Sequence, residues 1–330
     1  MQWLTEVVDA SHAGEARRIA VECAASIGMN ETDCGKVAIA VTEMATNLVK
    51  HAQHGKLLCE PIGRNGASGL RVVAIDKGPG IRNISAALQD GYSTYGSNGN
   101  GLGAIRRLST IFDIYSVPGL GTCIVAEFWP QKNTASAHFS LGVVSLALRG
   151  EPVSGDGWGM RATADHSFFM VVDGLGHGTF ASEAAREAER VLAESDATSA
   201  ANILRDCHDA LKKTRGAAAA IAEISREKGT VTYAGIGNIS AVVVDGQKRR
   251  GIASHNGTLG HQMHKIQEFT VPWNAESILI MHSDGLGSKW DLNQYPGLTS
   301  KHPSIIAAML YQDFRRERDD VTVMTAKNAS

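Results

Sequence analysis

The sequence has no excess of charge of either sign and no long apolar run. Its 32 lysines and arginines nearly balance its 34 aspartates and glutamates, which leaves a formal charge of -2. Without a strongly basic surface, the chain has no general attraction to nucleic acid or to an anionic membrane. No segment approaches the roughly 20 apolar residues of a membrane-spanning helix, and the first residues do not resemble a signal peptide. We therefore expect a cytoplasmic protein that binds neither nucleic acid nor membranes.

Cysteine and proline are also scarce. The five cysteines are odd in number and scattered, and no two of them form a C-x-x-C pair. This pattern predicts neither a disulfide framework nor a zinc site. Proline occurs only 8 times, but glycine occurs 35 times in 330 residues, above the average of roughly 7%. The combination indicates a folded chain that is rich in turns and loops.

The length favours two domains, because a typical domain has about 100–200 residues. The clearest boundary is the polar segment PQKNTASA over 130–137, which separates a strand-like run from an apolar run. We therefore predict a first domain over residues 1–130, a linker over 131–137 and a second domain over 138–330.

Helical and strand-like stretches occur in both domains. In the first, apolar residues at helical spacing predict one helix that stops at Gly28 and another from about Thr32 to His51. Strand-like runs surround a glycine-rich loop over 90–103, which predicts helices on one face of an antiparallel sheet. The second domain alternates strand-like runs with helical stretches, which predicts sheets with helices outside them. Both domains therefore belong to the α+β class.

Three polar motifs of the first domain occur in the order expected of a nucleotide site. Glu43 and Asn47 are four residues apart, so they are neighbours on one helix surface. There, a carboxylate and an amide are suited to act as a base and a metal ligand. Asp76 follows a strand, where its carboxylate can accept a hydrogen bond from an exocyclic amine. The run 98–103 (NGNGLG) opens a helix whose free N–H groups suit phosphate oxygens.

Together, the strings VTEMATNLVKHA, DKGPGI and GNGLGAIRRLS resemble the N, G1 and G2 boxes of the GHKL ATP-binding family, and particularly its anti-sigma serine/threonine kinase branch. The resemblance covers residues 1–130 and implies a Bergerat-type α/β sandwich. It implies that Glu43 accepts the proton of an attacking serine hydroxyl and that Asn47 binds the Mg²⁺ that bridges the ATP phosphates. The ATP contacts that it implies in addition are Asp76, Gly78, Gly80, Gly99, Gly101, Leu102, Gly103 and Thr122.

Aspartates recur beside glycine at the ends of predicted strands in the second domain. Asp-Gly is a common tight-turn pair, and Asp245-Gly246 is predicted to be such a turn. The strings VSGDGWGM, VVDGLGHG and MHSDGLGS instead place the aspartate after a strand in a glycine-dense, non-hairpin context. If these carboxylates converge, they need cations among them, and all-oxygen ligation selects magnesium or manganese over zinc.

With RDDVTVM, these strings resemble the metal-dependent type 2C protein phosphatases, in their bacterial sporulation and stress-response (SpoIIE-like) branch. The resemblance covers residues 138–330 and implies a β-sandwich flanked by helices. It implies that a water bridging two Mn²⁺ or Mg²⁺ ions attacks phosphoserine or phosphothreonine. The metal ligands that it implies are Asp156, Asp173, the Gly174 carbonyl, Asp284, Asp319 and Asp320. For His177, in DGLGHG, a place near the substrate phosphate and a hydrogen-bonded position within the loop both remain open.

The two resemblances together imply a bacterial partner-switching regulator that combines an ATP-dependent serine/threonine kinase with a metal-dependent phosphatase. The implied partners are STAS-type antagonist proteins, in a sigma-factor pathway or on a stressosome-like scaffold. One alternative is that the first domain binds ATP and sequesters a partner without transferring phosphate. Another is that the second domain is a degenerate phosphatase fold used for docking. The sequence does not indicate the oligomeric state.

Overall fold

The computed structural model describes residues 2–52, 55–64, 66–89, 101–130, 138–163, 165–263 and 265–329. The chain forms two compact units. The first contains Met1–His138, Gln294–Met309 and residue 329, and the second contains Phe139–Asn293, Leu310–Asn328 and residue 330. The predicted linker over 131–137 lies outside the described residues, so the predicted domain boundaries stay a prediction.

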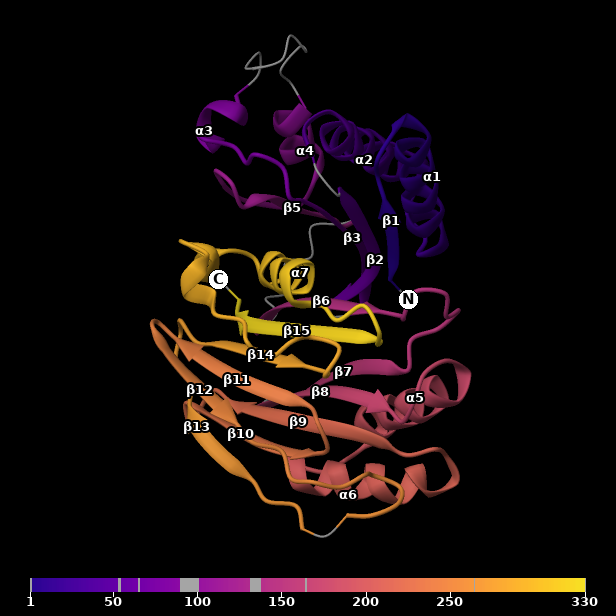
Figure 1. Ribbon diagram of the computed structural model, residues 1–330, viewed down its shortest axis with the longest axis vertical. Helices are drawn as coiled ribbons and strands as arrows, with labels where there is room; N and C mark the ends of the chain where they lie inside the picture. Colours follow the sequence, from indigo (N-terminus) through magenta and orange to yellow (C-terminus); the bar gives the residue numbers. More distant parts are fainter. Residues whose placement is uncertain are drawn as a thin grey trace. The chain divides into compact units, whose positions relative to one another are not determined.

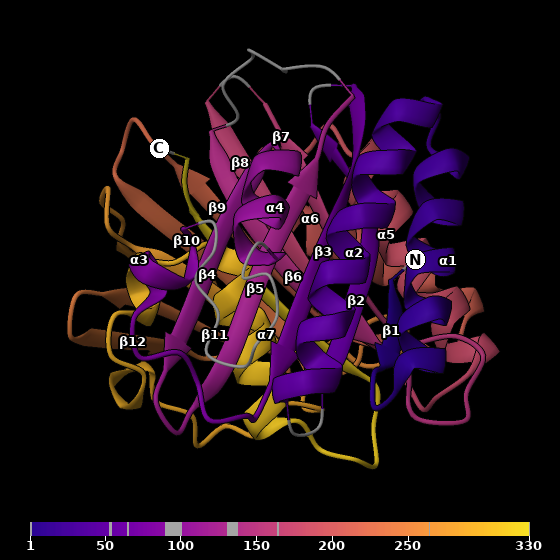
Figure 2. The same ribbon diagram turned by 90° about the horizontal axis from the view of Figure 1, so that it is seen from above.

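A five-stranded antiparallel sheet forms the centre of the first unit. Its strand order is β1-β2-β3-β5-β4. The bounds are β1 Trp3–Glu6, β2 Lys56–Arg64, β3 Ala67–Asp76, β4 Ile111–Val117 and β5 Gly121–Phe128. Helices α1 (Ala10–Ser26), α2 (Glu31–His51) and α4 (Gly101–Leu108) pack on one face of it, and a short helix, α3, covers Ile84–Ala87 (Figures 1 and 2).

Capping and burial explain where helix α2 lies. Its apolar stripe of Val37, Val41 and Met44 is fully buried against the sheet. The helix begins one residue before the predicted start, because the side chain of Asn30, and not that of Thr32, accepts a hydrogen bond from a backbone N–H of the first turn. Because this stripe faces the sheet, Glu43 and Asn47, which neighbour it on the helix surface, lie beside the core.

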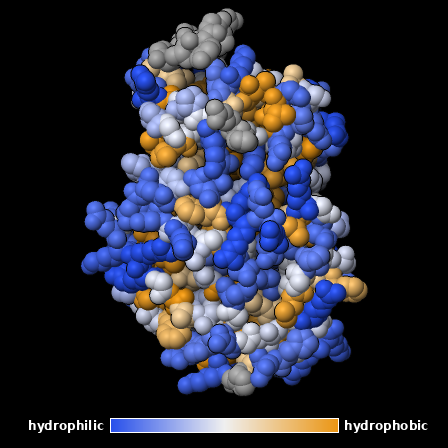
Figure 3. Space-filling view, in the orientation of Figure 1, coloured by the Kyte–Doolittle hydropathy of each residue, from blue (hydrophilic) through white to orange (hydrophobic). Residues whose placement is uncertain are grey.

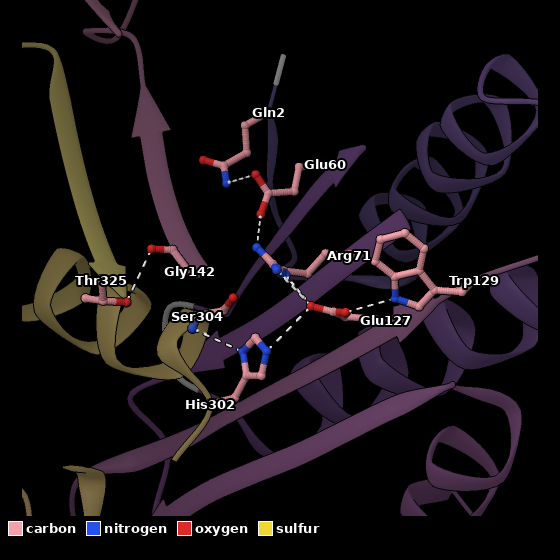
Figure 4. A network of polar contacts seen from close by, with 9 residues as sticks. All are labelled: Gln2, Glu60, Arg71, Glu127, Trp129, Gly142, His302, Ser304 and Thr325. Atoms are coloured by element: carbon pink, nitrogen blue, oxygen red, sulfur yellow. Dashed lines mark hydrogen bonds and ion pairs between the residues drawn. The ribbon is translucent and has the colours of Figure 1, made fainter. Parts of the chain in front are cut away.

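A buried charge network lies on the opposite face of this sheet (Figure 4). The Arg71 guanidinium lies 2.9 Å from Glu60 Oε1 and 2.8 Å from Glu127 Oε1, and all three side chains are at most 10% exposed. Trp129 Nε1 donates to Glu127 Oε2 at 3.0 Å. His302 Nε2 lies 3.5 Å from Glu127 Oε1. The late segment Gln294–Met309 thus completes the first unit on this face.

The second unit is a sandwich of two five-stranded antiparallel sheets. Their strand orders are β13-β10-β9-β8-β7 and β12-β11-β14-β15-β6. The strand bounds are β6 Phe139–Leu146, β7 Asp156–Ala162, β8 His166–Gly174, β9 Ala217–Ser225, β10 Thr230–Ile236, β11 Ser240–Asp245, β12 Lys248–Ile252, β13 Phe269–Pro272, β14 Ile278–His282 and β15 Val321–Asn328. The core between the sheets includes Phe169, Tyr233 and Met281.

Helices α5 (Thr179–Glu194) and α6 (Ala200–Ala210) cover the outer face of the sheet that contains β8 and β9 (Figure 1). The remaining helix is α7 (Pro303–Phe314), and three short 3-10 helices cover Leu211–Lys213, Leu292–Gln294 and Leu298–Ser300. The predicted turn at Asp245-Gly246 joins β11 to β12, as expected. The α+β class predicted for both domains is confirmed.

The surface shown in Figure 3 is mainly hydrophilic, with hydrophobic residues in small groups. In the described ranges, the large hydrophobic side chains that are exposed are Val8, Ile39, Leu120, Met160, Leu175 and Phe180. None of the helices within these ranges combines the length and the apolar character needed to cross a bilayer.

Candidate functional site

The end of strand β3 holds the carboxylate predicted to bind adenine. Asp76 is the last residue of β3 and pairs in register with Thr122 on β5. The backbone N–H of Gly78 donates to Asp76 Oδ1 at 2.6 Å, and burial raises the pKa of Asp76 to about 6. Gly80 has a φ of +74°, and a Cβ there would lie 2.3 Å from the Val117 carbonyl oxygen. The turn therefore needs glycine, and it fixes a partly buried hydrogen-bond acceptor.

Helix α2 lies beside both this turn and the start of α4. A Cβ on Gly101 would lie 2.7 Å from Glu43 Oε2 and 3.8 Å from the amide atoms of Asn47. At the C-terminal end of α2, a Cβ on Gly78 would lie 2.6 Å from the His51 carbonyl oxygen. The helix rises about 12 Å between Glu43 and His51. The three predicted motifs therefore lie along the C-terminal half of one helix, with the acceptor turn beside its last residue and Glu43 about two turns earlier.

The glycine-rich loop is described only in part. Gly99, together with the rest of residues 90–100, lies outside the described residues. Gly101, Leu102 and Gly103 form the first turn of α4, where Gly103 is buried and Leu102 packs against the core. The lack of a side chain at Gly101 lets the backbone of α4 lie close to Glu43.

The aspartates predicted as metal ligands gather at one end of the second unit. Asp156, at the start of β7, pairs in register with Asp173, near the end of β8. The side-chain amide of Asn238 donates to Asp284 Oδ2 at 2.8 Å and to Asp173 Oδ2 at 3.3 Å. Burial, and then the nearby charge of Asp284, raise the pKa of Asp319, which lies before β15. Segments that are far apart in the sequence thus bring their carboxylates together.

Crowding of these carboxylates has a clear electrostatic cost. Burial raises the pKa of Asp156 well above its usual range, and the charge of Asp173 adds to the rise. Burial also raises the pKa of Asp173 to about 7, with further contributions from Asp284 and Asp319. A cation among them would relieve this repulsion. Their hard oxygen donors fit Mg²⁺ or Mn²⁺, although among the described residues no three acidic, His or Cys side chains already form a metal cage.

Asp320 and Ser283 hold this cluster together. Asp320 accepts hydrogen bonds from the backbone N–H of Leu148 at 2.7 Å and of Gly155 at 2.8 Å, so both of its oxygens are engaged by the chain itself. Its predicted role as a ligand stays a prediction. Ser283 Oγ donates to Asp156 Oδ2 at 2.6 Å. Gly174 is also constrained, since a Cβ there would lie 2.1 Å from a backbone carbonyl oxygen of α5.

Sequence reasoning did not identify Asn238 or Ser283. Asn238 lies in the string GIGNIS just before β11, and Ser283 directly precedes Asp284. Neither has a spacing that marks it as functional, although a polar residue beside a candidate ligand is a weak signal. His177 takes the hydrogen-bonded loop position, because its Nδ1 lies 2.7 Å from Glu151 Oε1.

The fold and these sites define a protein with a GHKL-type ATPase domain and a type 2C phosphatase domain. The family described as histidine kinase-like ATPase domain matches residues 7–128, and the family described as stage II sporulation protein E (SpoIIE) matches residues 163–328. The chain belongs to both families, the first through its N-terminal part and the second through its C-terminal half. The predicted fusion of the two domains is thereby confirmed.

The relatives agree with this assignment. The chain is 36% identical over 114 residues to the serine/threonine-protein kinase RsbT of Bacillus subtilis (strain 168), covering 34% of this chain and 86% of RsbT. It is 28% identical over 151 residues to the phosphoserine phosphatase RsbX of the same organism, covering 45% of this chain and 75% of RsbX. The chain is thus a regulator of the partner-switching type, with a serine/threonine phosphatase domain and a kinase-related domain.

Two solved structures each resemble more than half of this chain. The structure described as "Crystal structure of RsbX in complex with magnesium in space group P1" has a TM-score of 0.51 and 25% identity, covering 59% of this chain and 98% of that one. One described as "The bacterial stressosome: a modular system that has been adapted to control secondary messenger signaling" has a TM-score of 0.54 and 26% identity, covering 58% of this chain and 100% of that one.

Proposed function

We propose that this chain both adds phosphate to and removes it from serine or threonine residues of STAS-type antagonist proteins. The first unit acts as an ATP- and Mg²⁺-dependent kinase, and the second as a phosphatase with two Mn²⁺ or Mg²⁺ ions. The observation that carries the proposal is the convergence of the second unit's aspartates around Asp173. Similarity to a serine/threonine-protein kinase and to a phosphoserine phosphatase supports both halves of it.

The metal ions of the phosphatase half would be held by carboxylates and one carbonyl. Bound there, such ions lower the pKa of a coordinated water and neutralise phosphate charge. The similar RsbX structure is in complex with magnesium, which supports a divalent-metal site in this half of the chain. The proposed ligands are Asp156, Asp173, the Gly174 carbonyl, Asp284, Asp319 and Asp320.

Neighbouring residues position these ligands. Asn238 donates to both Asp173 and Asp284 and so fixes the separation of the two carboxylates. Ser283 donates to Asp156 and accepts from the backbone of β15, so it ties β7 to the strand that follows Asp319. Such outer contacts orient ligands and tune their affinity for a metal. These residues thus hold the carboxylates close together despite their repulsion.

In the kinase half, the proposed roles follow the length of α2. Asp76 accepts a hydrogen bond from the adenine amine, and Asn47 holds Mg²⁺ near the start of α4. Glu43 takes the proton of the attacking serine hydroxyl, the oxygen–phosphorus bond forms on that serine, and ADP leaves. The contact between Gly101 and Glu43 supports this arrangement, because it places the first backbone turn of α4 beside the proposed base.

The proposed partners are STAS-type proteins in a sigma-factor pathway or on a stressosome-like scaffold, and the proposed location is the cytoplasm. The similarity to RsbT and RsbX, and to a structure described as the bacterial stressosome, supports this setting. The proposed STAS-type partners are the proteins whose serine or threonine would gain and lose the phosphate.

A paired assay of the full chain tests the proposal. A STAS protein is incubated with radiolabelled ATP and Mg²⁺ to measure incorporation, and the phosphorylated protein is then incubated with Mn²⁺ to measure release. We expect Glu43→Gln to abolish incorporation but not release, and Asp173→Asn to do the reverse. Release that survives in Asp173→Asn contradicts the phosphatase assignment. Tight ATP and partner binding without incorporation by the unaltered chain would instead favour sequestration.

A further inference from the structure

The loop that follows Asp173 carries an exposed surface that the proposed chemistry does not use. We call it the recognition patch and define it by Leu175, Phe180 and Arg215. Leu175 is 44% exposed and Phe180 is 59% exposed, which places them among the few exposed large hydrophobic side chains of the described ranges. The guanidinium carbon of Arg215 lies 4.9 Å from the centre of the Phe180 ring. An apolar surface and a cation thus lie side by side.

The recognition patch borders the aspartate cluster. Asp173 and Gly174 on β8 pair in register with the first residues of β9, which directly follow the turn that carries Arg215. The N–H of Leu175 donates to the Gly216 carbonyl oxygen at 3.0 Å. A Cβ on Gly176 would lie 3.2 Å from Arg215 Nη1. The patch therefore begins within two residues of a proposed metal ligand, where a bound phosphoprotein would extend beyond its phosphate.

The turn that presents Arg215 is held in place. The Arg215 carbonyl oxygen lies 2.8 Å from His261 Nε2. The backbone N–H of the next residue, Gly216, donates to Thr214 Oγ1 at 3.0 Å. Gly216 has a φ of +80°, and a Cβ there would lie 2.5 Å from the Leu259 carbonyl oxygen. A preformed turn loses little conformational freedom when a ligand binds.

The facing loop is held as well. His177 pairs with Glu151 at 2.7 Å, and a Cβ on Gly178 would lie 2.9 Å from Glu151 Oε2. Glu151 thus anchors the loop between Gly174 and the start of α5 from outside. Both sides of the recognition patch are therefore built before any ligand arrives.

The charge of the recognition patch favours an acidic ligand. Within the part of the chain that the structure describes, no carboxylate pairs with the Arg215 guanidinium, which stacks on Phe180 and keeps N–H groups for a ligand. Helix α5 starts beside it at Thr179 without a side-chain cap, so its N-terminal N–H groups add positive potential. Arginine and aromatic residues are also typical of binding hot spots.

We propose that the recognition patch binds the polypeptide of the protein substrate next to its phosphorylated residue. An apolar side chain of the substrate packs on Leu175 and Phe180, and an acidic side chain pairs with Arg215. The inference rests on the proposed phosphatase function and gives that site a substrate preference: phosphoserine or phosphothreonine with apolar and acidic neighbours.

The test uses the full chain with Mn²⁺ and two sets of phosphoserine peptides. In the first set, each peptide carries one leucine and one glutamate at two of the four positions nearest the phosphoserine, and the set covers every choice of these two positions. The second set has alanine in place of the leucine and lysine in place of the glutamate. We expect the best peptide of the first set to exceed the second set about tenfold in kcat/KM, mainly through KM. Arg215→Ala and Phe180→Ala should each remove most of this preference, whereas Arg205→Ala and Ile39→Ala, two exposed control sites, should keep it.

Two outcomes overturn the inference. The first is equal kcat/KM for both peptide sets, or a preference that survives Arg215→Ala and Phe180→Ala. The second is an equal loss of p-nitrophenyl phosphate hydrolysis in Arg215→Ala, which would mean that Arg215 binds the phosphate itself. Calorimetric binding of the same peptides to Asp173→Asn separates recognition from turnover. A preference that is seen there and lost with Arg215→Ala supports the patch even if the unaltered chain hydrolyses nothing.

Discussion

At the scale of single residues, Asp76 is expected to set the pH dependence of ATP binding. Burial raises its pKa to about 6, so the carboxylate is ionised at pH 7 and gains a proton as the pH falls through 6. Protonation replaces an acceptor oxygen by a donor, so ATP affinity should drop below about pH 6. Titration with a fluorescent ATP analogue between pH 5 and pH 8 measures this. Asp76→Asn should bind weakly throughout; an unchanged profile in that variant would contradict the role.

Asn238 is expected to act as a positioning residue for the metal site. Because its amide donates to Asp173 and to Asp284, Asn238→Ala removes the contact that orients both carboxylates. We expect the Mn²⁺ concentration for half-maximal phosphatase activity to rise about 10–100-fold, with a smaller effect on kcat at saturating Mn²⁺. Asn293→Ala, at another exposed asparagine of the same unit, is the matched control. An equal effect of both substitutions would mean that neither acts through the metal.

The residues of the two sites could be predicted unequally well from the sequence. Asp173 and Asp284 lie in glycine-rich strings that have a family resemblance, so they could be named. Asn238 and Ser283 could not, because their roles depend on which loops meet in space and not on any local pattern. His177 illustrates the same limit, since its partner Glu151 lies on another loop.

At the scale of secondary structure, the glycine that opens α4 is expected to control the kinase site. Gly101→Ala would place a methyl group 2.7 Å from Glu43 Oε2, so the flexible Glu43 side chain must move. We expect kinase turnover to fall more than tenfold, while the free energy of unfolding changes by only about 1 kcal/mol. Phosphate incorporation and urea unfolding measure the two effects. Normal kinase turnover in Gly101→Ala would contradict the proposed role of Glu43 as the base.

Two other glycines serve as references for this substitution. Gly121 has a φ of +85°, and a Cβ there would lie 1.9 Å from the Asp76 carbonyl oxygen, so Gly121→Ala should destabilise the chain by about 2–4 kcal/mol. Gly35 lies within α2 and has nothing within 4 Å of an added Cβ, so Gly35→Ala should stabilise it by up to about 1 kcal/mol.

Elements with a strong periodic pattern could be predicted, and short strands could not. Helix α2 has an apolar stripe along its whole length, so its bounds were predicted within one residue. Strands β1 and β13 have four residues each, β12 is mostly charged and exposed, and β7 is interrupted by glycine. These strands form because neighbouring strands offer them hydrogen-bond partners, which a local reading of sequence does not reveal.

At the scale of the whole molecule, the buried charge network is expected to matter for stability. Arg71→Ala would leave Glu60 and Glu127 buried without their cation, which should cost about 3–5 kcal/mol. Replacing all three by leucine or methionine removes the unpaired charges and should cost far less. Urea denaturation of the full chain compares the variants. If the triple variant were as unstable as Arg71→Ala, packing and not charge pairing would explain the loss.

The architecture of each unit could be predicted from its motifs. That the late segment Gln294–Met309 belongs to the first unit could not be predicted. Asp113 accepts hydrogen bonds from Lys301 Nζ at 3.2 Å and from the His302 N–H at 2.7 Å. This pairing joins residues nearly two hundred positions apart, and neither residue stands out in the sequence.

Because Gln294–Met309 belongs to the first unit, that unit cannot be finished while the ribosome is still translating the middle of the message. Asp113 and Glu127 leave the exit tunnel long before their partners exist. Until Lys301 and His302 emerge, one face of the nascent sheet lacks the segment that covers it. The unit that is synthesised first is therefore among the last to finish folding.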